Sequence, residues 1–276
     1  MPTTELLLHV QRVPPQGAGL RAALALAQRL DARLDALHVV DMPPAAFTLP
    51  EAVPMQLDAA RQRSLDAKAL AEPWTLLLRE HGLAGDWRVG NGDTVQTLCH
   101  AAAGYDLLVM ERGIMRGDAP IGFGTVSRTV FGSTRPVLVV PEQATVDSFG
   151  ERILVAWNGS RESALAVRAG LPLFASAGSI TILDGSGDDD FPETSALPGG
   201  DIGTWLQRHE VTADIRRLDP ASVSNPGPAL LALAAEINAD LIVMGAWGRS
   251  RLSEMVLGGT TRHLFMNGTL PMLVAH

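Results

Sequence analysis

The strongest constraint on the fold of this chain is an internal repeat. Residues 106–110, with the sequence DLLVM, return 134 residues later as residues 240–244, with the sequence DLIVM. At the same offset the chain repeats a glycine, a small hydroxyl residue and an arginine, which are Gly124, Ser127 and Arg128 in the first copy and Gly258, Thr261 and Arg262 in the second. So much shared order indicates two diverged copies of one unit. We therefore predict an N-terminal domain over residues 1–145 and a C-terminal domain over residues 150–276.

Each copy alternates short apolar runs with segments of helical periodicity. The runs are continuous rather than alternating, which is typical of strands that are covered on both faces in a parallel sheet. Between them, apolar residues recur at helical spacing, as at Leu20, Ala23, Leu24 and Ala27. We expect an α/β fold with two tandem Rossmann-like domains, each a five-stranded parallel sheet with helices on both faces. The expected strands cover residues 6–10, 36–40, 87–89, 107–110 and 137–140, then 153–157, 179–183, 213–218, 241–244 and 272–275.

The two copies differ most after their second strand. The first carries a Pro-rich stretch at residues 41–54 and then a long amphipathic segment at residues 59–81. The second has a short acidic loop at residues 185–190 and a smaller helix around residues 203–209. Loops of this kind lie over the carboxyl edge of the sheet, where ligands bind in this class of fold.

The composition excludes several classes of protein. A formal net charge of −8 argues against nucleic-acid binding, which needs a concentrated basic face. The single Cys99 rules out an internal disulfide. No run approaches the roughly 20 apolar residues of a membrane span, and the N-terminus lacks the basic region of a signal peptide. We therefore expect a cytoplasmic protein with neither a membrane nor a nucleic acid as partner.

Common catalytic motifs are also missing from the sequence. There is no Gly-x4-Gly-Lys-(Ser/Thr) loop of nucleotide triphosphatases, no HExxH zinc spacing and no Gly-x-Ser-x-Gly turn. No pattern of residues activates a nucleophile. We predict that the protein is not an enzyme and has no metal site of its own, with slow ATP hydrolysis left open.

The segment after the fourth strand of the second copy has the chemistry of an anion site. Gly245 and Gly248 let the backbone leave the strand with unusual torsions and let a ligand approach closely. Residues 258–261, Gly-Gly-Thr-Thr, come at a predicted helix start, where free N–H groups and the helix dipole suit a phosphate. Arg249 could add charge-assisted hydrogen bonds.

This arrangement, Gly-x2-Gly-x9-Gly-(Ser/Thr) after the fourth strand of a five-stranded α/β unit, resembles the universal stress protein family. The likeness covers both copies, as in tandem-domain members. In nucleotide-binding members the loop holds the phosphates and ribose of ATP. An acidic residue after the first strand and main-chain groups after the second strand recognise adenine. The resemblance implies ATP or another adenine nucleotide as cofactor, with or without Mg²⁺.

The phosphate part of the family motif is nearly complete in the second copy. Gly245, Gly248 and Gly258 match it directly. Gly259 stands where the family has Ser or Thr and so lacks one hydroxyl. The hydroxyls of residues 260–261, Thr260 and Thr261, would replace it.

The adenine part of the motif departs further from the family. Asn158 stands where nucleotide-binding members often have Asp, and an amide can both donate to and accept from adenine. Leu183, at the end of the second strand, would supply the main-chain contact to the base. Both positions are predictions carried over from the resemblance.

The first copy departs from the motif in a different way. Gly124 and Ser127 match its end, but Glu111 and Ile114 replace its two leading glycines. A carboxylate beside a phosphate pocket is repulsive, and the isoleucine adds bulk where backbone must come close. We therefore predict that the first copy is degenerate for nucleotide binding and that the second holds the site.

Three functions remain in competition on the sequence alone. The first is a regulatory stress-response module that binds an adenine nucleotide in its C-terminal domain. The second is a nucleotide-free scaffold, whose halves pack through their terminal strands and which acts through protein partners. The third is an adenylate-handling enzyme, for which Asp184 and Asp240 are the available carboxylates, although Asp240 is expected at the wrong end of the sheet. A homodimer or an intramolecular pseudo-dimer is expected in each case.

Overall fold

The computed structural model describes residues 4–41, 53–113, 124–146, 149–186, 201–246 and 259–276. The first half is built, in chain order, from β1 (Glu5–His9), α1 (Ala18–Leu30), β2 (Arg33–Asp41), α2 (Val53–Lys68), α3 (Ala71–Glu80), β3 (Trp87–Gly92), α4 (Thr94–Ala102), β4 (Leu107–Arg112), α5 (Thr125–Gly132) and β5 (Val137–Pro141).

The second half repeats this alternation. It consists of β6 (Arg152–Trp157), α6 (Arg161–Phe174), β7 (Ser179–Asp184), α7 (Ile202–Gln207), β8 (Asp214–Arg217), the 3₁₀ turn η3 (Pro220–Ser222), α8 (Gly227–Glu236), β9 (Leu241–Gly245), α9 (Gly259–Asn267) and β10 (Met272–Ala275). All ten strands predicted from apolar runs are confirmed.

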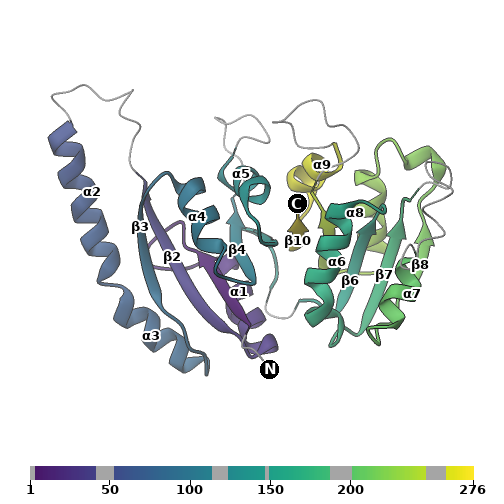
Figure 1. Ribbon diagram of the computed structural model, residues 1–276, viewed down its shortest axis with the longest axis horizontal. Helices are drawn as coiled ribbons and strands as arrows, with labels where there is room; N and C mark the ends of the chain where they lie inside the picture. Colours follow the sequence, from purple (N-terminus) through teal and green to yellow (C-terminus); the bar gives the residue numbers. More distant parts are fainter. Residues whose placement is uncertain (1–3, 42–52, 114–123, 147–148, 187–200, 247–258) are drawn as a thin grey trace.

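The strands form one ten-stranded sheet in the order β3-β2-β1-β4-β5-β10-β9-β6-β7-β8. Within each half all neighbouring strands are parallel. Figure 1 shows the first half on the left, the second on the right and helices around both. The predicted α/β fold with two tandem Rossmann-like halves is confirmed.

The two halves are joined where β5 pairs with β10 in antiparallel orientation. Met272 lies opposite Val139, and Val274 lies opposite Val137. These side chains are fully buried, so the junction is continuous with the core. The halves therefore form an intramolecular pair through their terminal strands. Packing of the two halves through their terminal strands is the arrangement expected of a fused pair.

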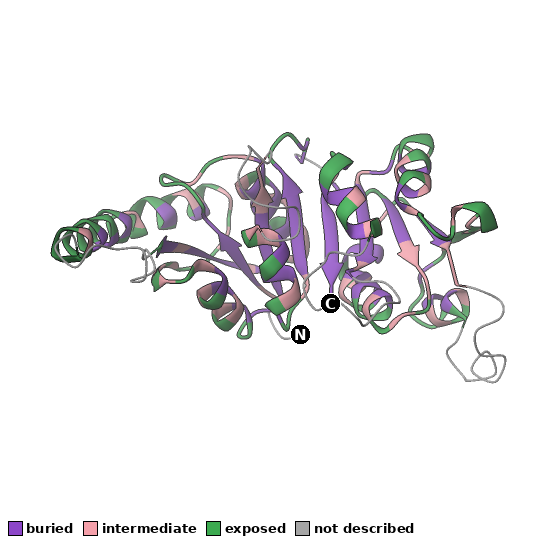
Figure 2. Cartoon of the chain, turned by 90° about the horizontal axis from the view of Figure 1, so that it is seen from above, coloured by how far each residue is buried: buried purple, intermediate pink, exposed green. Residues whose placement is uncertain are grey.

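Helices cover both faces of the sheet. One buried cluster joins the sheet to α1, α3, α6 and α7, and a second joins its other face to α4, α5, α8 and α9. Figure 2 shows the buried strands along the centre and exposed residues on the outer helices, above all along α2 at the far left. The continuous apolar runs are explained, because each central strand is covered twice.

Residues 59–81 do not form the single amphipathic segment that we expected. They belong to two helices, α2 and α3, separated at residues 69–70. The cause is Pro73, which has no N–H to donate to the carbonyl of Ala69 and whose ring clashes with a continuing helix. Only α3 buries large side chains, Trp74 and Leu78.

Candidate functional site

Three strand ends of the second half meet at one edge of the sheet. In the parallel register, Ala156 of β6 lies opposite Met244 of β9, so Asn158, just beyond β6, follows beside the end of β9 at Gly245. On the other side of β6, Trp157 lies opposite Asp184 at the end of β7. This carboxyl edge is where α/β sheets bind ligands.

Asn158 is held at this edge by a local turn. Its side-chain oxygen accepts a hydrogen bond from the Ser160 N–H at 3.1 Å. Ser160 in turn is the N-cap of α6, and its hydroxyl accepts from the Ser163 N–H at 3.2 Å. The carbonyl of the Asn158 amide is therefore engaged in starting α6, and its NH₂ group is the part that this turn does not use.

Leu183, predicted to be the last residue of the second strand, lies one residue before the end of β7. It is a buried residue inside β7, opposite Ala156 of β6 and Arg216 of β8. The strand ends one residue later at Asp184, whose Oδ1 accepts from the Ser186 N–H at 2.9 Å and from the Ser186 hydroxyl. The polar groups at this end of β7 are therefore those of Asp184 and Ser186.

The side chain of Asp184 also faces a cation from the neighbouring strand. Arg217, the last residue of β8, places its Nε 3.8 Å from Asp184 Oδ2. Sequence reasoning did not find this pair. The only available signal was that both residues end strands whose carboxyl ends share one edge of the sheet.

Gly245 has a packing role that the sequence did not reveal. A Cβ added to it would lie 2.5 Å from the Ser163 N and 2.6 Å from the Glu162 carbonyl carbon. Both are backbone atoms in the first turn of α6, so they cannot move aside cheaply. The residue must be glycine for α6 to pack on the end of β9, whether or not a ligand is bound.

The amino end of α9 is the described part of the phosphate motif. Gly259 is its first residue, and a Cβ there would meet no atom of the described residues within 4 Å. Thr261 is buried, whereas Thr260 is half-buried and is the hydroxyl nearer to solvent. Three further predicted site residues lie outside the described residues, namely Gly248, Arg249 and Gly258.

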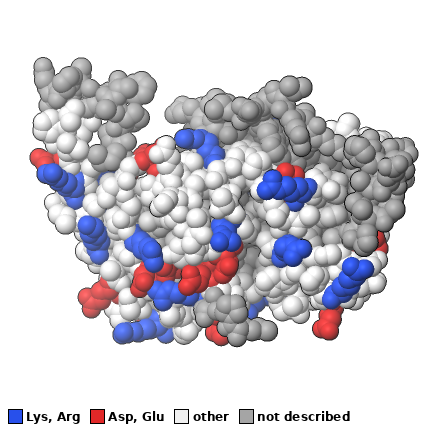
Figure 3. Space-filling model, in the orientation of Figure 1, with Lys and Arg blue, Asp and Glu red and all other residues white. Residues whose placement is uncertain are grey.

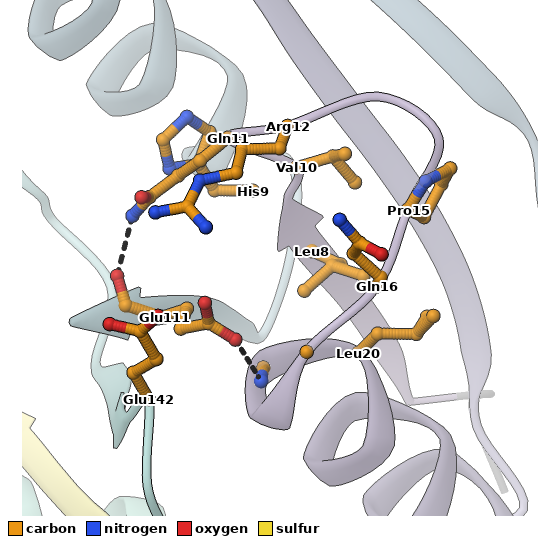
Figure 4. A pocket seen from close by; sticks show the side chains of 12 residues that line it. Leu8, His9, Val10, Gln11, Arg12, Pro15, Gln16, Leu20, Glu111 and Glu142 are labelled. Atoms are coloured by element: carbon orange, nitrogen blue, oxygen red, sulfur yellow. Dashed lines mark hydrogen bonds between the residues drawn. The ribbon is translucent and has the colours of Figure 1, made fainter. Parts of the chain in front are cut away.

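The equivalent edge of the first half contains a cavity of about 220 Å³ (Figure 4). Its lining includes the apolar Leu8, Val10 and Leu20, one cation, Arg12, and two carboxylates on one side, Glu111 and Glu142. Glu111 is the next-to-last residue of β4, before Arg112, and corresponds in the repeat to Gly245. A strand-end carboxylate in one half thus replaces a glycine in the other.

The Glu111 carboxylate occupies the amino end of α1. Its Oε2 accepts a hydrogen bond from the Gly19 N–H at 2.8 Å. A Cβ at Gly17 would lie 2.4 Å from that same oxygen, and one at Gly19 would lie 2.9 Å from Glu111 Cβ. The two glycines therefore make room for Glu111, and the helix end carries an internal anion.

The two halves exchange the positions of a glycine and a glutamate. In the first half, Gly19 is the second residue of α1 and Glu111 lies at the end of β4. In the second half, Glu162 is the second residue of α6 and Gly245 ends β9. Each helix start thus has one acidic residue beside it, supplied by the strand in the first half and by the helix itself in the second.

His9 is a buried histidine beside the first cavity. Burial, together with the nearby His38, lowers the pKa of His9 to about 4. Within the described part of the chain, its Nδ1 has no hydrogen-bond partner. His9 is therefore neutral at physiological pH, and the cavity has no second cation from this residue.

The carboxylates proposed for an enzyme do not come together. Asp240 accepts from the Gly150 N–H at 2.8 Å and from the Arg152 N–H at 3.1 Å, which places it at the amino edge of the sheet. Asp184 lies at the carboxyl edge. Among the described residues there is no group of three or more side chains able to hold a metal ion.

The sequence matches the universal stress protein family over residues 6–141 and again over residues 150–276. The chain belongs to the universal stress protein family. It is similar to a universal stress protein of Mycolicibacterium smegmatis, with 24% identity across 98% of this chain and 96% of that one.

Two solved structures share the tandem fold of this family member. A universal stress protein of Archaeoglobus fulgidus superposes with a TM-score of 0.74 at 18% identity, covering 100% of this chain and 99% of that one. A functionally unknown protein of Pseudomonas aeruginosa gives a TM-score of 0.59 at 17% identity, covering 99% and 92%. At these identities the likeness establishes the fold alone.

The surface adds two observations about partners. On the face shown in Figure 3, Lys and Arg side chains are separate from one another and interspersed with Asp and Glu, and they form no continuous basic surface. Within the ranges that the structure describes, no helix is long and apolar enough to cross a bilayer.

Proposed function

We propose that this universal stress protein is a regulatory module that binds ATP or a related adenine nucleotide in its C-terminal domain, residues 150–276. The N-terminal domain, residues 1–145, would bind no nucleotide. The bound nucleotide would bias the conformation or the choice of partner under stress, with no chemical step required of the protein.

One observation carries this proposal: the two carboxyl edges differ in charge. The ends of β4 and β5 carry Glu111 and Glu142, which line the first cavity and would repel a phosphate. In the described part of the second half, the ends of β9 and β10 carry Gly245, Ala246 and His276 and no acidic side chain. At these strand ends the second half is therefore better suited to an anion than the first, and its nearest strand-end carboxylate, Asp184, lies farther along the edge at the end of β7.

Two features of the helix starts support α9 as the helix that would receive the phosphates. The start of α6 already has the Ser160 hydroxyl as cap and the Glu162 carboxylate in its first turn. The start of α9 has the open Gly259 and the partly exposed Thr260. Phosphates would therefore bind at α9, with Gly248, Arg249 and Gly258 completing the loop, and the Asn158 amide would address the base.

Calorimetric titration of the full chain with ATP and with AMP tests the proposal. We expect one nucleotide per chain, and a Gly248→Glu variant should lose binding because it places a carboxylate in the loop. Ile114→Glu is the matched control, since residue 114 is the equivalent position of the first half. It should leave the affinity unchanged. Two nucleotides per chain, or equal losses in both variants, would contradict the assignment.

A nucleotide-free scaffold is the second candidate, and two observations favour it. Gly259 lacks the hydroxyl found in the family, and the Asn158 carbonyl is already engaged with Ser160. The absence of heat at millimolar ATP would decide for this function. Capture of protein partners with the intact chain would then replace nucleotide binding as the assay.

A further inference from the structure

Helix α2 exposes an unusual amount of apolar surface. Met55 is 72% exposed, Leu65 is 60% exposed and Leu57 is 41% exposed. Its buried residues are small, namely Ala60, Ser64 and Ala67. Figure 1 shows α2 along the outer flank of the first half, beside β3. A helix that turns small residues inward and large apolar ones outward is not positioned by core packing alone.

A groove of about 620 Å³ follows one side of this helix. Of the described residues that line it, six come from α2 at helical spacing and one from β3: Leu57, Ala60, Arg61, Ser64, Leu65, Lys68 and Asn91. The strand β3 ends the ten-stranded sheet, so no further strand covers this side. The small Ala60 and Ser64 leave the space between helix and strand unfilled. Its volume falls within the range of small-molecule sites.

The charges of the groove are all of one sign. Arg61 and Lys68 line it, and among its described lining residues there is no carboxylate. Arg61 also lies 3.6 Å from Asp58, but both side chains are more than three-quarters exposed, so that ion pair is weak and can exchange. Lys68, the last residue of α2, has no carboxylate within ion-pair distance among the described residues. The site thus combines an apolar bed with two cations.

We propose that the groove between α2 and β3 binds an anionic amphiphile with a single hydrocarbon chain, of the fatty-acid class. The chain would lie on Leu57, Ala60 and Leu65, and the carboxylate would pair with Lys68 at the end of the helix. A nucleotide does not fit this chemistry, because it would place a polar base and ribose on the apolar bed. The site is separate from the carboxyl edge of the C-terminal domain and does not depend on its function.

Titration of the full chain with laurate, below its micelle concentration, tests this proposal by calorimetry. We expect saturable binding of one laurate per chain. Decanoate should bind about 15-fold more weakly, because each methylene buried contributes about fourfold to the affinity. Dodecyltrimethylammonium, with the same chain and a cationic head, should not bind.

Two variants and one control locate the site. Leu65→Ser removes an exposed apolar side chain of the bed, and Lys68→Glu reverses the charge that faces the ligand. Each should weaken laurate binding at least tenfold. Leu76→Ser is the matched control, because Leu76 is 50% exposed on α3 and lies outside the groove lining. Circular dichroism and thermal melting of each variant confirm that the fold is intact.

Several results would overturn the proposal. Equal binding of the cationic amphiphile, or equal weakening by Leu76→Ser, would show non-specific detergent-like adsorption. Absence of laurate binding would remove the ligand class. A concentration-dependent dimer that Leu65→Ser abolishes, with laurate inert, would assign the groove to a contact between two copies instead. ATP titration of the same variants keeps this test distinct from the nucleotide proposal.

Discussion

The Glu111 carboxylate at the end of β4 accepts a hydrogen bond from the Gly19 N–H in the first turn of α1, at 2.8 Å. Residues 92 positions apart thereby satisfy a free helix donor and place a negative charge at the positive end of the helix dipole. In the second half a serine N-cap and Glu162 serve the start of α6 instead. Both halves thus have an acidic residue at the start of this helix, but it comes from the strand in the first half and from the helix in the second.

Glu111→Ala should lower the free energy of unfolding by about 1 kcal/mol, the usual cost of losing a helix cap. Urea denaturation at pH 7 measures this change. Glu80→Ala is the control, because Glu80 is exposed at the end of α3 and its removal should change stability by less than about 0.5 kcal/mol. Equal effects of both substitutions would show that the Glu111 hydrogen bond contributes nothing specific.

Gly245→Ala should destabilise the protein by about 1–3 kcal/mol even without any ligand, because the new Cβ would overlap the backbone of α6. Gly259→Ala is its counterpart in the same site. A Cβ there meets no atom of the described residues within 4 Å, and alanine favours a helix, so the melting temperature should stay or rise. Thermal melts of the two ligand-free variants make the comparison. If Gly245→Ala left the melting temperature unchanged, the packing role would be wrong, and the glycine would be explained by close approach of a ligand instead.

Asp35 is a buried carboxylate with four partners. Its oxygens accept from the Asp86 N–H at 2.8 Å and the Tyr105 hydroxyl at 2.7 Å, and lie 3.1 Å from both Arg33 and Arg88. Asp35→Ala should cost about 2–4 kcal/mol, since it leaves the Tyr105 hydroxyl and the Asp86 N–H without their acceptor, while the partly exposed arginines stay hydrated. Urea denaturation would show this loss.

Tyr105→Phe removes only one donor from that network and should cost about 1–2 kcal/mol. Burial and the hydrogen bond to Asp35 raise the pKa of Tyr105, so its hydroxyl remains protonated and keeps donating. If Tyr105→Phe lowered the free energy of unfolding as much as Asp35→Ala does, the Tyr105 hydrogen bond would account for the whole contribution of the network. The other contacts of the Asp35 carboxylate would then add nothing.

The stability of the protein should fall in mild acid because of His9. Its pKa is about 4 in the folded state, against the ordinary 6.5 of an unfolded chain. Between these two pKa values His9 binds a proton in the unfolded state but not in the folded state. The contribution of His9 to the free energy of unfolding is therefore complete above pH 6.5 and declines as the pH falls toward 4. The largest contribution is roughly 3 kcal/mol.

Urea denaturation from pH 7.5 to 4.5 measures that slope. His9→Gln should flatten it, whereas the exposed His100→Gln should follow the parent protein. The difference between variants matters here, because carboxylates also titrate near the acid end of this range. A His9→Gln slope identical to that of the parent would show that His9 is not the titrating group.

The strands could be predicted because their signal is local. A continuous apolar run has few alternatives to a buried parallel strand, and even the short, exposed β8 falls within the predicted residues 213–218. The break between α2 and α3 was not predicted, although the sequence contains Pro73, because the helical spacing of apolar residues continues across the break. Periodicity indicates a helix but does not require a single one.

The site was harder to predict than the strands. Gly245 showed that space was needed at the end of β9, but not that α6 fills that space. Glu111 was read correctly as a charge at the first edge, yet its partner Gly19 could be found only from the fold. The unusual pair Gly17 and Gly19 at a helix start was the available signal. A glycine in a sequence can indicate that another group comes close to the backbone, but it does not identify that group.

Because β5 and β10 belong to one chain, their antiparallel pairing always joins one N-terminal half to one C-terminal half. Two separate chains that pair through these strands could exchange, forming mixtures of like and unlike pairs. Here the two different halves are covalently linked, so they always pair with each other. Strands β5 and β10 lie inside the sheet and cannot pair with a strand of another subunit. Each molecule therefore presents two different carboxyl edges in a constant ratio of one to one. Its response to a ligand would be graded by occupancy of a single site, without cooperativity between identical halves.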